Sequence, residues 1–402
     1  MSTLRITELN PEISFLLKCA RVYLNIDDPC EINQLIQQTS LNWDEVIKMA
    51  QVHRVLPILH KTLTLVSPQE LPDFVLPKLH QLHFKNIKRN FFLLQELIRF
   101  LDILKKHQID AITFKGPMTA MVAYGDLSLR TFYDLDLLVH SHDFFKLRDI
   151  AKNHGYTCDL LMAKEERECL TKLSFQDQEL YFNSQKEYSL VNAKNRIFLD
   201  IHQGVLSKQF SPLFNTQWIW EHTQQVKIGG HQVLGLTPEV QILVLCAQGV
   251  EDCWNHLGKL FDVAILIKNH PDLDWDQLVK LSKQMDVLPR LLLGLCLIRQ
   301  LYGFTLPDQI EQPLQNCTFI QKLAEALQRQ IILKSNINSK SKLDLLNAAY
   351  QLRLMSQWKN RIKFILTLMQ PTLADIATVS LPKSLFFIYY LLRPFRVMQL
   401  SK

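Results

Sequence analysis

Apolar residues recur every three or four positions through the first hundred residues, which is the spacing of amphipathic helices. Two such stripes are Phe15, Leu16, Cys19 and Val22, then Val46, Met49, Ala50 and His53. Asn42 and Asp44 precede the second stripe as candidate caps. A third, longer helix is expected over Leu76 to Leu104. The pattern predicts a helical N-terminal region over residues 1–105.

The pattern changes at Ile109. Ile109–Phe114 alternates and is rich in β-formers, and Lys115-Gly116-Pro117 then ends the strand and opens a helix with proline in its first turn. A second short apolar run, Leu135–Val139, predicts a buried strand. Ser141 and Asp143 follow it as candidate caps of a helix that runs through His154.

Two hairpins are expected further along the chain. Tyr188–Val191 and Arg196–Ile201 flank a four-residue loop, and Val226–Ile228 and Gln232–Leu234 are joined through Gly229-Gly230. Beyond Thr237-Pro238, which predicts a helix start, only helical periodicity remains. We therefore predict a predominantly helical α+β chain, with an α/β domain at 106–235 and a helical C-terminal domain at 236–402.

Composition is that of a folded protein, with 48% hydrophobic and 21% charged residues. The longest apolar runs, such as Leu291–Ile298 and Leu385–Leu392, are far shorter than the ~18 residues that a membrane span needs. The first residues lack the order of a signal peptide, so a cytoplasmic location is expected.

The eight cysteines form no C-x-x-C pair and lie in apolar helical patterns, which indicates buried thiols in a reducing compartment. Cys246, Cys253 and His256 are close enough in sequence to suggest zinc. Because no second pair of ligands accompanies them, core packing is the preferred interpretation.

Positive charge is concentrated at the end of the chain. From Lys334 onward there are eleven basic residues against Asp344 and Asp375, a net charge of +9 in a chain whose total is +6. Such a tail is either an electrostatic footprint for phosphates, in RNA or on an anionic membrane, or the solvated faces of ordinary helices.

The candidate chemistry centres on Asp134-Leu-Asp136. On a strand these two carboxylates point to the same face, where they repel each other unless a cation lies between them. Carboxylate oxygens, with substrate phosphate and water, are the ligands that Mg²⁺ prefers. Asp200, on the β-rich run Arg196–Ile201, is the predicted third carboxylate of a two-metal site.

Three more residues complete the candidate site. Lys115 and Gly116 offer a point charge and open backbone N–H groups to a triphosphate. Arg130, four residues before Asp134, is expected to hold either a phosphate or a structural carboxylate. His202 is a candidate proton shuttle or a hydrogen-bonded structural histidine. For Lys259 and Asp262, a local salt bridge is preferred over contact of Lys259 with the triphosphate.

The order strand, glycine turn, helix, arginine, D-x-D strand and later aspartate resembles the DNA polymerase β-like nucleotidyltransferases. It is most similar to a large uncharacterised bacterial nucleotidyltransferase family with the pattern K-G, then Y-G/D-x-x-x-R-x-x-x-D-x-D-L-L-V. The Phe198–His202 run resembles that family's V-D-L-H segment. The likeness extends to Leu236-Thr-Pro-Glu, Trp254–Asp262 and Tyr389–Pro394, and covers most of the chain from about residue 40.

The resemblance implies a polymerase β-like mixed sheet between helical regions, and Mg²⁺- or Mn²⁺-dependent transfer of a nucleoside monophosphate from a nucleoside triphosphate. Asp134, Asp136 and Asp200 match its metal and catalytic positions, and Lys115 and Gly116 match its phosphate turn. Pro117, Phe132 and Tyr133 depart from the pattern: the proline removes an N–H donor, and the rings either narrow the nucleotide pocket or stack on a base.

The acceptor stays open among small molecules, proteins and RNA. Two other classes of function also stay open. One is a nucleotide-binding regulatory module without turnover, and the other is a basic RNA- or membrane-binding protein on an inactive enzyme scaffold.

Overall fold

The computed structural model describes residues 10–157, 187–207, 210, 216–333, 344–369 and 388. The chain divides into two compact units that alternate along the sequence. Unit 1 comprises residues 1–99, 114–133 and 224–339, and unit 2 comprises residues 100–113, 134–223 and 340–402. The domain boundaries predicted after residues 105 and 235 cut the chain into three consecutive segments, and they stay a prediction.

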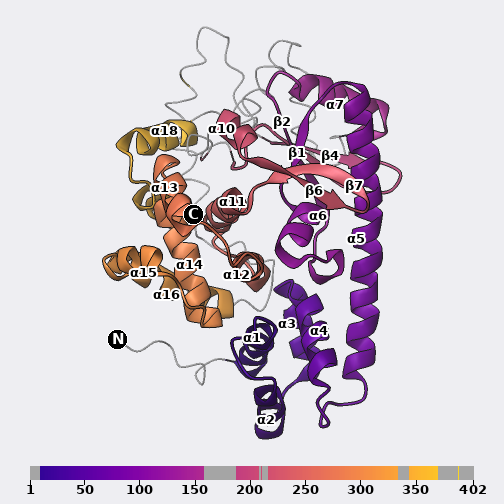
Figure 1. Cartoon of the computed structure of the whole chain (residues 1–402), viewed down its shortest axis with the longest axis vertical. Helices are drawn as coiled ribbons and strands as arrows, with labels where there is room; N and C mark the ends of the chain where they lie inside the picture. Colours follow the sequence, from indigo (N-terminus) through magenta and orange to yellow (C-terminus); the bar gives the residue numbers. More distant parts are fainter. Residues whose placement is uncertain are drawn as a thin grey trace. The chain divides into compact units, whose positions relative to one another are not determined.

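Unit 1 is built mainly from helices. They are α1 (Pro11–Tyr23), α2 (Cys30–Gln38), α3 (Trp43–Val52), α4 (Leu56–Val66), α11 (Pro238–Glu251), α12 (Leu257–Asn269), α13 (Trp275–Gln284), α14 (Leu288–Tyr302), α15 (Asp308–Gln315) and α16 (Thr318–Leu333). The long α5 (Val75–Lys106) contributes its residues up to Arg99. Helices α14, α15 and α16, orange in Figure 1, pack against one another.

The N-terminal stripes and helix starts agree with the sequence. Phe15, Leu16 and Cys19 are buried on α1. Asn42 caps α3, because its side-chain oxygen accepts a hydrogen bond from the Glu45 N–H at 3.2 Å. Helix α11 starts after Thr237 as predicted, although the Thr237 side chain makes no capping hydrogen bond.

Unit 2 contains a five-stranded mixed sheet in the order β1-β2-β5-β4-β3. The strands are β1 (Ala111–Thr113), β2 (Asp134–Val139), β3 (Tyr156–Thr157), β4 (Glu187–Asn192) and β5 (Phe198–His202). Strands β2 and β5 run parallel, and the other neighbouring pairs are antiparallel. The prediction of a helical α+β chain with a small mixed sheet is confirmed.

Both predicted hairpins form. Strands β4 and β5 pair across a turn in which the Asn192 side chain accepts hydrogen bonds from the N–H groups of Lys194 (3.0 Å) and Asn195 (3.3 Å). Strands β6 (Thr223–Ile228) and β7 (His231–Leu236) form a separate two-stranded sheet. Gly229 and Gly230 join them with φ of +57° and +87°, a conformation that glycine adopts without strain.

The remaining described helices of unit 2 are α7 (Phe144–Asn153), α10 (Thr216–Glu221), α17 (Asp344–Arg353) and α18 (Trp358–Leu368). Of the eleven basic residues in the tail, only Arg353, Lys359, Arg361 and Lys363 lie within the described residues. The proposed phosphate footprint of the tail thus stays a prediction. Among the helices that the structure describes, none has the length and apolar character to cross a membrane.

The cysteines within the described range are free thiols. Cys19, Cys246 and Cys296 are buried, and burial raises the pKa of each thiol above its ordinary value. These three agree with the expectation of buried thiols. Cys30 is exposed and Cys253 and Cys317 are partly exposed, so the expectation was wrong for them. Cys158 and Cys169 lie outside the described residues.

Candidate functional site

Two neighbouring parallel strands of unit 2 carry the three aspartates singled out from the sequence. Asp136 of β2 lies directly opposite Asp200 of β5, and Asp134 lies opposite Phe198. Residues two apart on a strand share a face, and opposed residues on adjacent strands point the same way. The structure therefore brings all three carboxylates onto one face of the sheet.

His202 lies on the same face and contacts two acidic side chains. Its Nε2 is 2.9 Å from Oδ1 of Asp136, and its Nδ1 is 3.8 Å from Oε2 of Glu187. Asp136 and His202 are buried, at 2% and 4% exposure, whereas Asp134 and Asp200 are partly exposed. His202 is thus a hydrogen-bonded histidine that fixes the orientation of the Asp136 carboxylate.

Glu187 was not singled out from the sequence. It reaches this face because β4 pairs antiparallel with β5 and places Glu187 opposite His202. The predicted hairpin does not give this register: with its four-residue loop Val191 would pair with Arg196 and Glu187 with Asp200, whereas in the structure Val191 lies opposite Phe198. The face therefore carries four acidic side chains around one histidine.

The electrostatics of this face are those of crowded carboxylates. Burial raises the pKa of Asp200 to about 6, and the negative charge of Asp136 acts in the same direction. A hydrogen bond from Ser189 and the nearby His202 act to lower that pKa. Asp200 is therefore destabilised in its ionised form, and a cation between the carboxylates would relieve this repulsion.

The donor set suits a hard divalent cation, because it consists of carboxylate oxygens on a rigid sheet. In the part of the chain that the structure describes, no three acidic, histidine or cysteine side chains already stand in the arrangement of a metal site. Metal binding would therefore need the side chains of this face to rearrange.

The other predicted residues belong to unit 1, on the segment 114–133. Lys115 precedes the short helix α6 (Gly116–Thr119), which continues into the π-helical turn η2 (Ala120–Tyr124). Gly116 has φ of +48°, which a side chain would strain, and Pro117 follows in the first turn. The predicted strand, glycine turn and helix therefore occur in that order.

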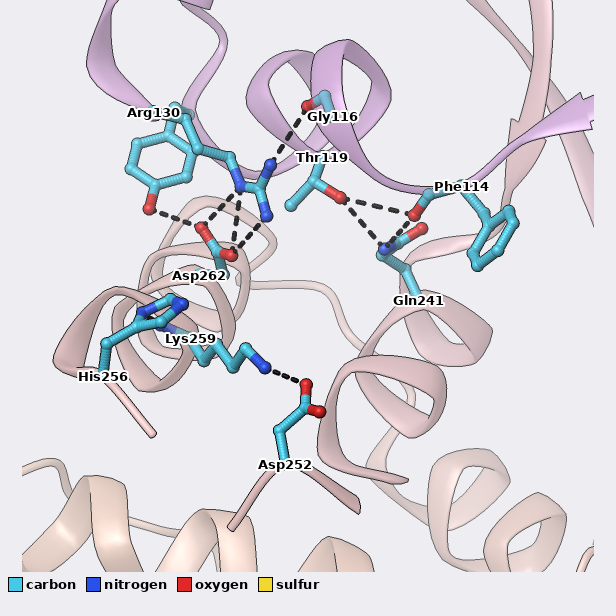
Figure 2. Close-up of polar contacts among 10 residues, drawn as sticks. Phe114, Gly116, Thr119, Arg130, Gln241, Asp252, His256, Lys259 and Asp262 are labelled. Carbon is cyan, nitrogen blue, oxygen red and sulfur yellow. Dashed lines mark hydrogen bonds and ion pairs between the residues drawn. The ribbon is translucent and has the colours of Figure 1, made fainter. Parts of the chain in front are cut away.

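Arg130 is held by a buried carboxylate (Figure 2). Its Nε and Nη2 donate to Asp262 of α12 at 2.9 to 3.1 Å, and its Nη1 donates to the Gly116 carbonyl at 3.4 Å. The Tyr124 hydroxyl also donates to Asp262, at 2.7 Å. Of the two roles expected for Arg130, the structure shows the pairing with a structural carboxylate, and a contact with phosphate stays a prediction.

Side chains of α5 and α11 fix the same segment at other points. The Asn90 amide donates to the carbonyls of Leu127 (2.7 Å) and Arg130 (2.8 Å). Gln241 donates to the Phe114 carbonyl at 2.8 Å, as Figure 2 also shows. Because its carbonyls are held by buried amides, the segment is a rigid part of unit 1.

A family model described as an uncharacterised nucleotidyltransferase matches residues 39–303, more than half of the 402-residue chain. The chain belongs to this nucleotidyltransferase family. Neither a curated protein nor a solved structure matches it. The matched residues include all six candidate site residues, and they end before the basic tail begins at Lys334.

Within the family match, Lys259 and Asp262 do not form the local salt bridge that their spacing suggested. Lys259 pairs with Asp252, whereas Asp262 pairs with Arg130 (Figure 2). The prediction was wrong because Asp262 lies on the face of α12 that meets the Arg130 guanidinium. The planar guanidinium makes three hydrogen bonds to this one carboxylate, a geometry that a lysine cannot match.

The two aromatic departures from the family pattern have different environments. Phe132 is buried at 1% exposure and belongs to the core of unit 1. Tyr133 is 49% exposed, and its ring lies against the guanidinium groups of Arg89 (4.2 Å) and Arg54 (5.3 Å). Only Tyr133 therefore offers an accessible ring for stacking.

Proposed function

We propose that this protein transfers a nucleoside monophosphate from a nucleoside triphosphate to an acceptor and releases pyrophosphate. The proposal depends on one observation above all, the alignment of Asp136 with Asp200 across β2 and β5, with Asp134 on the same face. Membership of a nucleotidyltransferase family supports it.

Asp134, Asp136 and Asp200 are the residues that would hold Mg²⁺ or Mn²⁺. When bound, the cation would stabilise negative charge on the transferring phosphoryl group. Without a cation, these carboxylates repel one another; burial and, after it, the charge of Asp136 raise the pKa of Asp200. In the absence of a cation, the contact between Asp136 Oδ1 and His202 Nε2 keeps that carboxylate oxygen oriented.

Residues of the chain itself would carry out proton transfer and phosphate binding. Asp200 takes the proton from the acceptor hydroxyl as its oxygen attacks the α-phosphorus, and the bond to the pyrophosphate oxygen breaks. For the remaining phosphates we propose the Lys115 ammonium and the backbone N–H at Gly116. Arg130 acts through the shape of segment 114–133, because its guanidinium holds both Asp262 and the Gly116 carbonyl.

The direct test is replacement of Asp134 or Asp136 by asparagine, which keeps the shape and removes the charge. Transfer of label from α-labelled ATP, CTP, GTP and UTP, together with pyrophosphate release, is measured in cell extract. Each variant should lose at least about 1,000-fold in rate, since each removes a charge that acts on the transition state. Asp110→Asn, at an exposed position beside β1, is the matched control and should keep full activity.

Full activity in both aspartate variants would reject the assignment. Nucleotide binding by calorimetry without pyrophosphate release from any acceptor would also reject transfer, and would leave a nucleotide-binding module. The labelled product identifies the acceptor class, whether a small molecule, a protein or RNA.

A further inference from the structure

Helix α18 of unit 2 exposes four large apolar side chains. With their exposed fractions, they are Trp358 (65%), Ile362 (46%), Ile365 (46%) and Leu366 (59%). Their positions follow the spacing i, i+4, i+7 and i+8, which places them on one face of the helix as a continuous apolar row. Single exposed apolar residues are ordinary on a protein surface, whereas a contiguous row indicates a binding surface.

The opposite face of α18 packs on the rest of unit 2. Phe364 and Asn360 are buried, at 2% and 8% exposure. The Phe364 ring stacks on the ring of Phe210, with 5.1 Å between the ring centroids. Nε of Arg361 donates to the Met355 carbonyl at 2.8 Å, which ties the first turn of the helix to the residues before it. This packing directs the apolar row away from the core of unit 2.

Positive charge borders the apolar row on both sides. Helical geometry places Arg361 along one edge of the row, and Lys359 and Lys363 along the other. All three side chains are exposed. The helix contains no acidic residue, and the chain has none between Asp344 and Asp375. The row therefore lies between cations that its own helix does not neutralise.

This combination fits the surface of an anionic lipid bilayer. A helix that lies in the membrane interface buries an apolar face at the acyl boundary and keeps lysine and arginine at the level of the headgroups. Tryptophan is favoured at that depth because its ring is apolar and its N–H is polar. Nucleic acid would use the cations, but isoleucine and leucine offer its bases no surface for stacking.

A second copy of this chain fits the apolar row less well. Two α18 helices that meet along their rows would bring the bordering cations of both copies together. Like charges that face each other across an interface oppose association, and α18 has no acidic residue to relieve them. A lipid surface of negative charge is the complementary partner.

We propose that α18 docks this protein on anionic membrane surfaces. The apolar row enters the lipid interface, and the three bordering cations contact the lipid headgroups. The docking is peripheral, since the 11 residues of α18 are too few to cross a bilayer. Helix α18 lies outside the residues 39–303 that match the nucleotidyltransferase family, and the inference does not depend on the proposed transfer reaction.

The experiment measures flotation of the full chain with lipid vesicles. One set of vesicles is pure phosphatidylcholine, and the other is an equimolar mixture of phosphatidylcholine and phosphatidylserine. Wild type should float with the anionic vesicles at low salt and much less with the neutral ones. Raising the salt should weaken binding to the anionic vesicles, because it screens the attraction between the cations and the lipid.

Lys363→Gln tests the charged border. It should bind anionic vesicles about fivefold more weakly than wild type, the equivalent of about 1 kcal/mol for one cation near the surface. Its affinity for neutral vesicles should not change. Lys280→Gln, at an exposed position on α13, is the matched control and should bind like wild type.

Ile362→Gln tests the apolar row. It should bind both kinds of vesicle about 10-fold more weakly, because the exposed half of the isoleucine no longer gains from transfer to lipid. Leu65→Gln, on α4 at 68% exposure, is the matched control and should bind like wild type. Thermal unfolding shows whether each variant folds, and the variant of Lys363 or of Ile362 decides alone if the other does not fold.

Wild type that does not float with anionic vesicles overturns the proposal. Unchanged affinity in the folded variants of Lys363 and Ile362 also overturns it. Sedimentation of wild type without lipid tests the alternative occupant. A dimer that Ile362→Gln dissociates, together with no flotation, would assign the apolar row to a second copy and overturn the membrane assignment.

Discussion

Asp136 and Asp200 are direct partners across the parallel strands β2 and β5, although 63 residues separate them in sequence. Two carboxylates at adjacent positions on one face destabilise a sheet, because like charges repel and one of the pair is driven to take up a proton. The proposed metal-binding role would account for this arrangement, because a cation between the carboxylates would relieve the repulsion.

The cost of this arrangement is measurable in the metal-free protein. The pKa of folded Asp200, about 6, lies above its unfolded value of 3.8, so the folded state holds its proton more tightly. The associated stability is present below pH 3.8 and is lost as the pH rises through 6. Asp200→Asn should therefore raise the unfolding free energy at pH 7.5 by about 1–3 kcal/mol, and change it little at pH 3.8.

Urea unfolding in EDTA at the two pH values gives this comparison. Added Mg²⁺ should then stabilise wild type more than the asparagine variant, since the variant lacks one carboxylate ligand. An Asp200→Asn variant that is less stable than wild type at pH 7.5 in EDTA would contradict the predicted repulsion.

The ion pair of Arg130 with Asp262 should be essential to the stability of unit 1. Asp262→Asn leaves a guanidinium of 16% exposure facing a neutral amide, and breaking a buried pair costs about 3–5 kcal/mol. Tyr124→Phe, which removes one hydrogen bond to the same carboxylate, should cost only about 1 kcal/mol. Chemical denaturation gives the unfolding free energy that each variant loses relative to wild type. Equal losses in the two variants would mean that the ion pair is not the stronger contact.

Acid should destabilise unit 1 through His60 of α4. Burial lowers the pKa of His60 to about 4, and the charges of His83, His80 and Lys61 act in the same direction. Because the folded pKa lies below the unfolded value of 6.5, stability is full above pH 6.5 and falls as the pH drops toward 4.

Between pH 7 and pH 4, the His60→Gln variant should lose about 1–2 kcal/mol less unfolding free energy than wild type. This figure is reduced because the His60 ring is partly exposed. Melting temperatures across that range provide the measurement. His231→Gln, at an exposed position on β7, is the control and should follow wild type. Parallel pH profiles for the His60 variant and wild type would refute the assignment.

The ring of Trp254 leaves no space for a side chain at Gly249 of α11. Alanine normally stabilises a helix by about 1 kcal/mol relative to glycine. Here its Cβ would lie 2.5 Å from the ring of Trp254, which is fully buried, and overpacking of this kind costs about 1–3 kcal/mol or more. Gly249→Ala should therefore lower the melting temperature, and a rise would show that Trp254 moves aside freely.

Local pattern in the sequence was enough to predict most of the helices, strands β1, β2, β4 and β5 and both hairpins, whereas the short strand β3 was not predicted. Asn42 is adjacent to the helix that it caps, and Asp134 and Asp136 share a face because a strand repeats every two residues. The two-residue repeat also limits Asp200 to one of two faces. These features depend on neighbours within a few residues, so the order of residue types determines them.

The tertiary structure alone decided which distant groups meet. Nothing local to Asp262 distinguishes pairing with Lys259 three residues earlier from pairing with Arg130, and packing of α12 against segment 114–133 selects the arginine. The contact of His202 with Asp136 likewise needs the parallel register of β2 and β5. Long-range register is set by burial of whole faces, a property of the folded chain that no short stretch of sequence contains.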